Sequence, residues 1–319
     1  MATDSVKSDV KEAHGKALPA YVLVTPAWNE AEFIEETLRS MVTQTVLPLR
    51  WVIVSDGSTD GTDEIVRQFT SRYDWIELVR TPERAERHFA GKVHAFNAGW
   101  DRVKRLTYDI IGNLDADISF EPDLMEFLLA RFAADAELGV AGTAFIEDGA
   151  VLYDYGIVST EDVSGQCQLF RRQCFEEIGG YTPSKIGGID SMAVYAAAMK
   201  GWTTRTFTEK AFIHHRQVGT AQNTIYSTRF KNGRKDYCLG GHPLWEVFRC
   251  LYQMKNRPYV IGGLLMYAGY VWAYLKGAER PMSPELVRFR RREQLQRLKG
   301  IIRRLLMPPS PNTESHIQH

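Results

Sequence analysis

The sequence predicts an α/β fold in which a mostly parallel sheet carries helices on both faces. Short apolar, β-rich segments alternate with segments of helical period over residues 20–215, as in repeated βαβ units. The strand-like segments are almost wholly apolar, which is typical of strands buried on both faces. Carboxylate side chains follow the ends of several of these segments, and the carboxyl ends of strands are where open α/β sheets bind ligands. The 319 residues can form one large domain or two smaller ones.

The composition narrows the class of protein. Lysine plus arginine equals aspartate plus glutamate, at 39 each, so no bulk attraction to nucleic acid is expected. The four cysteines lack the spacing of a metal site, and we expect free thiols in a reducing compartment. These cysteines are Cys167, Cys174, Cys238 and Cys250. Residues 1–19 are predicted to form a flexible polar arm without a secretory signal, which favours a cytoplasmic protein.

The first strand is predicted over residues 21–25, and the turn after it carries Pro26, Asn29 and Glu30. A helix of apolar period is expected next, over residues 33–41. The Gly-x-Gly-x-x-Gly pattern of a dinucleotide-binding turn is missing at this position, which argues against a dehydrogenase. A glycine-rich basic phosphate loop is missing as well, which argues against a nucleotidyltransferase.

The second predicted strand, residues 51–55, runs into Asp56-Gly57-Ser58. Asp56 precedes the turn and is therefore well placed to contact a ligand. Asp60 or Thr62 is predicted to cap the helix that is expected over residues 63–72.

A basic residue lies at the start of the next helix, which is expected over residues 91–100. Lys92 falls in its first turn, where the helix dipole disfavours a cation. The residue is therefore expected to contact a phosphate, unless it is simply a solvated lysine.

The central motif follows the fourth predicted strand, residues 110–114. Asp115 and Asp117 are two residues apart, so their side chains face one point if the chain stays extended. Two such carboxylates repel each other unless a divalent cation lies between them, and oxygen ligands suit Mg²⁺ or Mn²⁺. Such an ion is usually shared with the phosphates of a substrate. The alternative is a polar turn without a ligand.

The later segments complete the α/β pattern. One helix is expected after Pro122 and another to end at Gly179. A mobile loop is expected over residues 147–165. The remaining strands are predicted at residues 76–79, 140–146, 168–170, 202–207 and 211–213.

Two more polar positions are candidates for chemistry. Asp190 lies at the start of a helix after Gly187-Gly188. It is either an N-cap or a general base that accepts a proton from a hydroxyl. The last predicted strand ends in His214-His215-Arg216. A histidine there can bind a metal or be structural, and Arg216 can pair with a phosphate.

The order of these motifs resembles that of the family 2 glycosyltransferases, enzymes of the GT-A fold, whose central sheet is Rossmann-like. The resemblance covers residues 20–220. The matching residues are Pro26, Asn29 and Glu30 in the opening turn, Asp56, Gly57 and Ser58 after the second strand, Lys92, Ala95, Asn97 and Gly99 in the helix before the central strand, and Asp115 and Asp117 in the family's Asp-x-Asp motif.

The resemblance implies a role for each motif. It implies a metal ion, Mn²⁺ or Mg²⁺, held by Asp115, Asp117 and His214, which follows the strand more directly than His215. The family's Glu-Asp pair is Ile189-Asp190 here, so the aspartate expected to be the base is kept while the glutamate is lost. Contacts with a nucleotide-sugar donor are implied for Pro26, Asn29, Glu30, Asp56, Lys92, Asn97, Asp115 and Arg216.

The resemblance therefore implies an inverting, metal-dependent glycosyltransferase of the type that acts in bacterial polysaccharide or glycan assembly. It would move one sugar from a donor, with UDP the commonest carrier, to a hydroxyl of a glycan or lipid-linked acceptor. Asp190 would deprotonate that hydroxyl, while the metal with Lys92 or Arg216 would stabilise the leaving nucleoside diphosphate. The Gln/Arg-x-x-Arg-Trp motif of processive members is absent, which favours a single addition. A sugar nucleotidyltransferase and a non-catalytic nucleotide-sugar-binding protein are the alternatives.

The C-terminal segment has a different character. Residues 260–275 contain no charge but are shorter than the ~20 residues of a bilayer-spanning helix. A helical extension over residues 221–307 is expected to associate with the inner face of the cell membrane through residues 255–304, either as a short membrane-embedded or re-entrant helix pair or as an interfacial amphipathic anchor. The alternative is an oligomer interface. Residues 226–241 are expected to close over donor or acceptor, and residues 308–319 to be disordered.

Overall fold

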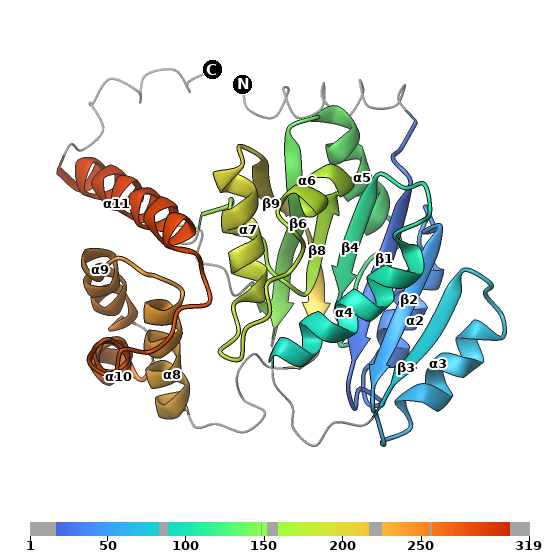
Figure 1. Ribbon diagram of the computed structural model, residues 1–319, viewed down its shortest axis with the longest axis horizontal. Helices are drawn as coiled ribbons and strands as arrows, with labels where there is room; N and C mark the ends of the chain where they lie inside the picture. The colour runs from blue at the N-terminus through green and yellow to red at the C-terminus, as the bar shows by residue number, and fades with distance from the viewer. Residues whose placement is uncertain are drawn as a thin grey trace, which may run out of the picture. The chain divides into compact units, whose positions relative to one another are not determined.

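A computed structural model describes residues 17–82, 89–147, 149–151, 159–216, 225–255 and 257–306. The chain divides into two compact units, Met1–Ala221 and Gln222–His319. Figure 1 shows the first unit as a sheet covered by helices and the second as a group of helices. The predicted tail, and all but the last three residues of the predicted arm, lie outside the described residues.

Within the described residues, the first unit is built on one sheet with the strand order β3-β2-β1-β4-β8-β6-β9-β5, and β7 pairs with β6. The strands are β1 (Tyr21–Ala27), β2 (Arg50–Asp56), β3 (Ile76–Thr81), β4 (Ile110–Leu114), β5 (Ile118–Ser119), β6 (Leu138–Glu147), β7 (Ala150–Val151), β8 (Cys167–Arg171) and β9 (Thr203–His214). The helices are α2 (Ile34–Val42), α3 (Thr62–Thr70), α4 (Phe89–Val103), α5 (Leu124–Ala134), α6 (Arg172–Glu177) and α7 (Ile189–Met199).

The strand directions bring many carboxyl ends to one edge of this sheet. β3, β2, β1 and β4 are parallel to one another. β8 is antiparallel to both β4 and β6, so β6 runs in the direction of β4, and β9 is parallel to β6. The carboxyl ends of β1, β2, β3, β4, β6 and β9 therefore lie along a common edge. The predicted α/β class is confirmed, with the reversed β8 making the sheet mixed.

Apolar side chains fill both faces of the sheet. Tyr21, Leu23 and Ile53 belong to the core on the face of α2, α3 and α5. On the other face a Cβ at Gly99 would lie 2.5 Å from Cγ1 of Val24, so only glycine lets α4 lie directly on β1 and β2. In Figure 1, α4 and α7 cross the near face of the sheet and α2 lies behind it. The four cysteines are buried free thiols, as predicted.

One expectation about the later strands is wrong in detail. The segments expected at 202–207 and 211–213 form one strand, β9, whose pairing with β6 is interrupted by an irregularity. Of the expected mobile loop, residues 148 and 152–158 lie outside the described residues, and the part from residue 159 is hydrogen-bonded to β9. The backbone N–H of Thr206 donates to the carbonyl of Thr160, and Oγ1 of Thr204 donates to the carbonyl of Glu161 at 2.7 Å.

The second unit consists of α8 (Ile225–Cys238), α9 (Pro243–Gln253), α10 (Tyr259–Leu275) and α11 (Pro284–Leu306). Glycines let the backbones of α8 and α10 touch. A Cβ at Gly233 would lie 1.8 Å from the carbonyl oxygen of Met266, and one at Gly269 would lie 2.1 Å from that of Phe230. Most of the segment 226–241 is helix α8, and its closing over donor or acceptor stays a prediction. Among the described residues, no helix is both long and apolar enough to cross a bilayer.

Candidate active site

Polar side chains gather along the common edge of the sheet because each follows the carboxyl end of a strand. Asn29 and Glu30 follow β1, Asp56 ends β2, Asp115 and Asp117 follow β4, Glu147 ends β6, and His214 ends β9. Pro26 belongs to β1 itself, opposite Val54 of β2. Asn97 is half-buried on α4. The topology thus assembles most of the predicted site from distant parts of the chain.

Asp115 is held by a cation and an amide. Nζ of Lys92 lies 2.5 Å from Oδ1 of Asp115, and Nδ2 of Asn113 donates to the same oxygen at 2.9 Å. Burial, with the charge of Asp117, raises the pKa of Asp115 although Lys92 opposes this. Burial alone would lower the pKa of Lys92. The negative charge of Asp115, and to a smaller extent the charges of Asp190 and Asp117, raise it above its usual value. Lys92 is therefore protonated beside Asp115, and its contact with a phosphate stays a prediction.

Asp117 is surrounded by different cations. Its Oδ2 lies 3.6 Å from Nε2 of His214 and 3.9 Å from Nε of Arg216. Burial acts to raise the pKa of Asp117, but the hydrogen bond and charge of His214, with the charge of Arg216, hold it below its usual value. Burial likewise acts to lower the pKa of His214, and Asp117 with Glu147 raises it instead. Asp117 is therefore ionised at neutral pH.

Glu147 is a residue of the site that sequence reasoning missed. Nδ1 of the His214 ring lies 3.1 Å from Oε2 of Glu147, on the opposite side of the ring from Asp117. The carboxylate thereby fixes the orientation of the ring and favours a proton on Nδ1, which leaves Nε2 directed at Asp117. Glu147 ends a buried strand, as Asp56 does, so the rule that singled out Asp56 would also have found it.

The predicted metal ligands are only partly brought together. Oδ1 of Asp115 is bound by Lys92 and Asn113, whereas Oδ2 of Asp117 lies beside His214. Among the described residues, no three Asp, Glu, His or Cys side chains form a metal-binding group. The donor set nevertheless fits Mn²⁺ or Mg²⁺ in its chemistry, since an ionised carboxylate and an imidazole nitrogen lie side by side in Asp117 and His214. These two residues form the core of the candidate metal site.

The neighbouring residues of the last strand have separate roles. Nε2 of His215 lies 2.9 Å from Oγ of Ser119, and its ring stacks on Phe33 with 6.0 Å between centroids. The imidazole beside the carboxylate of Asp117 is therefore that of His214, while His215 contacts Asp117 through its backbone N–H, which donates to the carbonyl of Asp117 at 2.9 Å. Arg216 makes two hydrogen bonds to the carboxylate of Glu30, one of them 3.1 Å long. Glu30 and Arg216, which are both predicted to contact the donor, therefore form an ion pair with each other.

The turn after β1 is tied to the turn after β2. Oδ1 of Asn29 accepts from the backbone N–H of Thr59 at 2.8 Å, and its own N–H donates to Oγ of Ser58 at 3.1 Å. Asn29 has φ 54°, a left-handed conformation that asparagine tolerates better than most residues. The N–H of Glu30 donates to Oγ1 of Thr62 at 2.8 Å. Asn29 therefore positions both turns at the edge.

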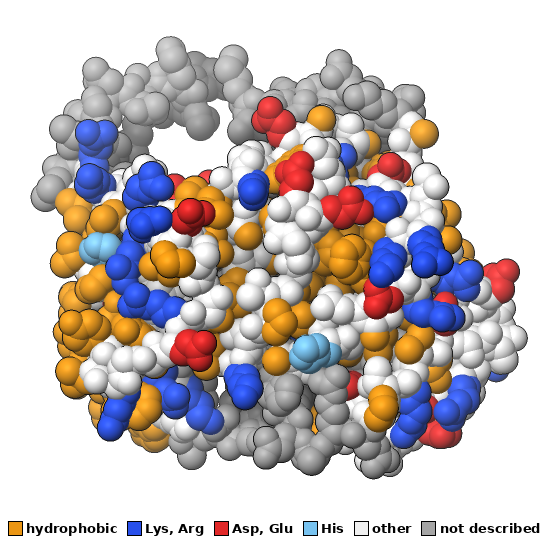
Figure 2. Space-filling model, in the orientation of Figure 1, with side chains coloured by type: hydrophobic (Ala, Val, Ile, Leu, Met, Phe, Trp, Pro, Cys, Tyr) orange, Lys and Arg blue, Asp and Glu red, His pale blue; other side chains and the backbone are white. Residues whose placement is uncertain are grey.

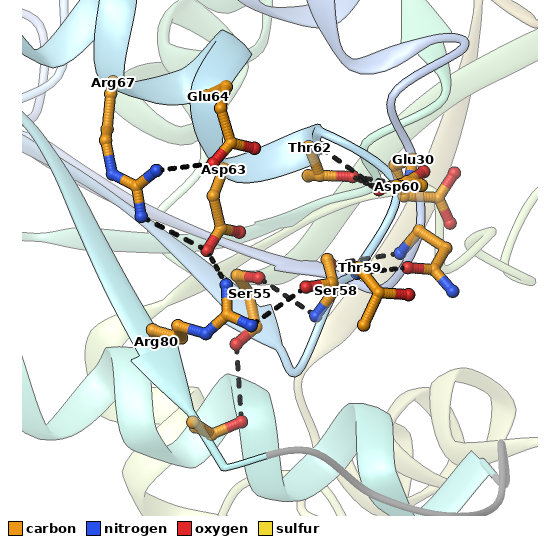
Figure 3. Close-up of polar contacts among 12 residues, drawn as sticks. Glu30, Ser55, Ser58, Thr59, Asp60, Thr62, Asp63, Glu64, Arg67 and Arg80 are labelled. Carbon is orange, nitrogen blue, oxygen red and sulfur yellow. Dashed lines mark hydrogen bonds and ion pairs between the residues drawn. The ribbon is translucent and has the colours of Figure 1, made fainter.

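The turn that carries Asp56 is also held from β3 (Figure 3). Arg80 pairs with the buried Asp63 and donates to the carbonyl of Ser58 at 3.0 Å. Oγ1 of Thr81 donates to Oδ1 of Asp56 at 2.8 Å. These contacts fix the carboxylate of Asp56 at the edge where a ligand would meet it.

Asp60 or Thr62 is expected to cap helix α3, but the structure has another residue at the N-cap. Oδ1 of Asp60 accepts from the backbone N–H of Thr62 at 3.1 Å, as a cap would, but the N-cap residue itself is Gly61 with φ 96°. Asp60 also accepts from the N–H of Ala31 at 2.9 Å. Asp60 therefore joins the start of α3 to the turn after β1.

Asp190 lies in the first turn of α7. Gly187 and Gly188 precede it with φ 84° and 75°, a conformation that favours glycine. The N-cap of α7 is Gly188, and no side chain makes the capping hydrogen bond. Asp190 is therefore not the N-cap, which leaves its carboxylate available for another role.

The two residues before β8, Gly165 and Gln166, lie between Asp190 and the region of Asp115. A Cβ at Gly165 would lie 2.8 Å from Cβ of Asp190, so this glycine packs directly on the aspartate. The carbonyl of Gly165 accepts from Nδ2 of Asn113 at 2.6 Å, and the N–H of Asp115 donates to the carbonyl of Gln166 at 2.8 Å. The two carboxylates therefore lie on either side of one short segment, and both act on the charge of Lys92.

The fold and this edge define a glycosyltransferase of the GT-A class. The chain belongs to family 2 of these enzymes, because residues 22–184 match the family described as Glycosyl transferase family 2. The predicted family and the prediction of a glycosyltransferase are thereby confirmed, and the nucleotidyltransferase and non-catalytic alternatives are set aside.

Curated relatives share part of the chain. A chondroitin synthase of Pasteurella multocida (strain Pm70) is 30% identical over 134 residues, which are 42% of this chain and 13% of that protein. A poly-beta-1,6-N-acetyl-D-glucosamine synthase of Staphylococcus aureus (strain COL) is 29% identical over 122 residues, 38% of this chain and 27% of that protein. The chain thus matches well under a third of either relative.

Solved structures share the fold over most of the chain. A mannosyltransferase of Pyrobaculum calidifontis, PcManGT in complex with GDP-Man and Mn²⁺, has a TM-score of 0.55 at 18% identity and covers 94% of this chain and 93% of its own. S. aureus TarS 1–349 in complex with UDP-GlcNAc has a TM-score of 0.51 at 13% identity, covering 89% and 81%. At these identities the likeness is one of fold.

Proposed function

We propose that this glycosyltransferase moves one sugar from a UDP-sugar to a hydroxyl group of a glycan or lipid-linked acceptor, with inversion at the anomeric carbon and with a divalent metal. The observation that carries the proposal is the arrangement along the sheet edge. Asp117 lies beside His214, and Asp190 lies across the Gly165 segment from the Asp115–Lys92 pair. Donor-bound relatives of the same fold carry UDP-GlcNAc or GDP-Man, and the same carboxylates suit either nucleotide.

Each residue of the edge has a part in the proposed reaction. Asp190 accepts the proton of the acceptor hydroxyl as the oxygen forms its bond to the anomeric carbon. The bond from that carbon to the diphosphate oxygen breaks, and the nucleoside diphosphate leaves with the electron pair. Lys92 and Arg216 place positive charge where the negative charge develops.

The donor and the metal are held by the remaining residues. Asp56 and Asp115 accept hydrogen bonds from the nucleoside. The nucleoside side of the edge is lined by Pro26, Asn29 and Glu30. Asn97 is assigned to the same donor side on the strength of the family motif. Asp117 and His214, with Glu147 behind the histidine ring, would hold Mn²⁺ or Mg²⁺, which when bound would supply charge stabilisation at the diphosphate.

Thermal unfolding with a panel of donors tests the proposal. UDP-, GDP- and dTDP-sugars are each added with and without Mn²⁺. A ligand at 100 times its Kd stabilises the protein by about 2.7 kcal/mol, which gives a clear rise in Tm. We expect the rise with a UDP-sugar and Mn²⁺ together, and its loss in Asp117→Asn.

The matched control for Asp117→Asn is Asp101→Asn. This change neutralises an exposed carboxylate of α4 that pairs with Lys104. The control should keep the full shift. A shift with GDP- or dTDP-sugar alone would replace UDP in the proposal. A shift that needs no metal and survives Asp117→Asn would overturn the metal site.

A further inference from the structure

The second unit exposes apolar side chains on α9. Leu244, Val247 and Leu251 lie at helical spacing on its outer side, while Trp245 and Cys250 face inward. An amphipathic helix of a folded protein normally turns charged residues outward instead. The outer side of α9 is therefore unusual for a surface in contact with water.

The following helix repeats this pattern. Val260, Leu264, Tyr267 and Leu275 of α10 are exposed, while Gly263 and Met266 are buried. With the three residues of α9, the exposed fractions run from 40% to 75%. We call these seven side chains the apolar face; they are Leu244, Val247, Leu251, Val260, Leu264, Tyr267 and Leu275.

The two halves of the apolar face are continuous because α10 runs back along α9. Near the connecting turn, a Cβ at Gly263 would lie 2.4 Å from the carbonyl oxygen of Cys250. Farther along, Oη of Tyr270 donates at 2.8 Å to the carbonyl of Gly241, just before α9 begins. The helices are therefore antiparallel neighbours.

Helical geometry then fixes the direction of the exposed residues. At about 100° per residue, Leu251 is turned roughly 100° from Cys250, and Leu264 roughly 100° from Gly263. Cys250 and Gly263 face each other, and in antiparallel helices equal turns from the contact lead to the same side. Figure 2 shows hydrophobic side chains gathered over α9 and α10.

From α9 through the end of α10 the exposed charges are positive, and the exposed Glu279 follows only after this stretch. From residue 243 to residue 278 the sequence contains a single acidic residue, Glu246, and it is buried. Lys255 and Arg257 are exposed in the turn between α9 and α10, and Lys276 is exposed at the far end of α10. Cations therefore stand at both ends of α10 with no exposed carboxylate between them.

The last helix adds to this positive charge. Arg288, Arg292, Lys299 and Arg303 of α11 are all exposed, and at about 100° per residue they fall within an arc of roughly 60°. Figure 2 shows Lys and Arg side chains over α11. Glu285, also exposed, falls within the same arc at the start of the helix. This side of α11 therefore carries four cations and one carboxylate, and its net charge is positive.

We infer that the apolar face docks on an anionic lipid surface, with α9 and α10 lying in the plane of the interface. Apolar side chains enter the boundary of the acyl chains while lysine and arginine contact the head groups. Exposed Tyr259, Trp272 and Tyr274 are residues that favour this boundary. A second copy of the chain would bring the same positive charges against one another, which disfavours association.

Co-sedimentation with vesicles tests the inference without any sugar transfer, so its outcome is independent of the proposed function. The full chain is mixed with phosphatidylcholine vesicles, and separately with equimolar phosphatidylcholine and phosphatidylglycerol. We expect binding to the anionic vesicles. Leu251→Glu with Leu264→Glu should weaken it at least roughly tenfold, because each change places a charge in the apolar boundary.

Neutralising the two cations of the turn between α9 and α10 tests how far charge contributes to vesicle binding. Each cation near an anionic surface contributes about fivefold in affinity, so Lys255→Gln with Arg257→Gln should cost about 30-fold on anionic vesicles. Matched controls change residues of the first unit that are also exposed. These are Leu47→Glu with Leu106→Glu, and Arg72→Gln with Arg105→Gln.

Both controls should bind as the wild-type chain does, and circular dichroism checks that every variant is folded. The inference is overturned if the wild-type chain binds neither vesicle, or if the controls lose as much affinity as the face variants. It is also overturned if light scattering shows a dimer that Leu251→Glu with Leu264→Glu dissociates while vesicle binding is unchanged. That last result would assign the apolar face to a second copy.

Discussion

Buried charges and close-packed glycines occur in both units, but they are arranged differently. Along the sheet edge, buried or half-buried carboxylates face cations, as in the Lys92–Asp115 and Arg216–Glu30 pairs. In the helical unit Glu246 is almost wholly buried and Oε2 of its carboxyl has no hydrogen-bond partner among the described residues. Its pKa is raised to about 8 by burial and by the charge of Asp236.

The glycines show a second difference. Gly187 and Gly188 supply backbone conformations that precede Asp190, whereas Gly233 and Gly269, like Gly99 on the sheet, remove side chains where backbones or helices pack closely. The comparison teaches that close-packed glycines serve packing in both units, whereas the paired charges of the sheet edge are proposed to serve ligand chemistry. Substitutions along the edge should change function with the fold intact, and those in the helical unit should change stability.

The largest effect is expected for the proposed base. Asp190→Asn keeps the size of the side chain but removes its ability to accept a proton, so kcat should fall by about 10²–10⁴. The donor-induced rise in Tm should remain, because Asp190 faces the acceptor. Asp101→Asn serves again as the control and should leave kcat unchanged. Near-full transfer by Asp190→Asn would remove Asp190 from the role of base.

A glycine of the helical unit should give the largest change in stability. In Gly233→Ala the new Cβ would meet the backbone of α10 at Met266, so the helices must separate at a cost of about 3 kcal/mol or more. Gly300→Ala is the matched control, since a Cβ there meets nothing within 4 Å and alanine favours the helix by about 1 kcal/mol. Chemical denaturation followed by circular dichroism measures both. Equal stability of the two variants would contradict the close contact of α8 and α10.

Glu147→Gln should weaken metal binding while leaving the fold intact. Loss of a carboxylate behind a metal-binding histidine typically costs 10- to 100-fold in affinity, or about 1.4–2.8 kcal/mol. Free Mn²⁺ measured by electron paramagnetic resonance reports this affinity without any turnover. Glu209→Gln, which neutralises an exposed carboxylate that pairs with Arg131, should bind Mn²⁺ normally. Unchanged affinity in Glu147→Gln would show that His214 needs no such support.

The last effect concerns the pH dependence of stability. In the folded chain Glu246 keeps its proton up to about pH 8, whereas in the unfolded chain it loses the proton near its ordinary pKa of about 4.3. The folded state therefore binds more protons between these values, and stability should fall as pH rises through this window, by at most about 1.4 kcal/mol per pH unit. Glu246→Gln should flatten this slope. An identical slope in the variant would contradict the raised pKa.

The sequence predicted the parts of the fold that depend on local pattern. The apolar segments that became β1, β2 and β4 were bounded by turn residues, and their ends correctly indicated where Asp56 and Asp115 would lie. Resemblance to a known family then assigned roles that spacing alone could not, such as that of Asp190. These assignments of individual residues stay predictions until they are measured.

Other features depend on contacts between distant segments and were not predictable. The direction of β8 follows from its partners β4 and β6, and no local pattern encodes it. The sequence places Glu147 at the start of a loop because its partner, His214, lies 67 positions away. Gly233 of α8 resembles a loop residue in the sequence, because its close contact with Met266 of α10 joins distant segments.

The configuration of the released sugar tests the central claim most directly. A single displacement at the sheet edge, with a deprotonated hydroxyl as nucleophile, inverts the anomeric carbon. The wild-type chain is incubated with the UDP-sugar and Mn²⁺ but without acceptor, so that water takes the place of the hydroxyl, and proton NMR follows the first anomer formed. We predict a sugar of the opposite configuration to the donor. A sugar that first appears with the donor's own configuration would contradict the account.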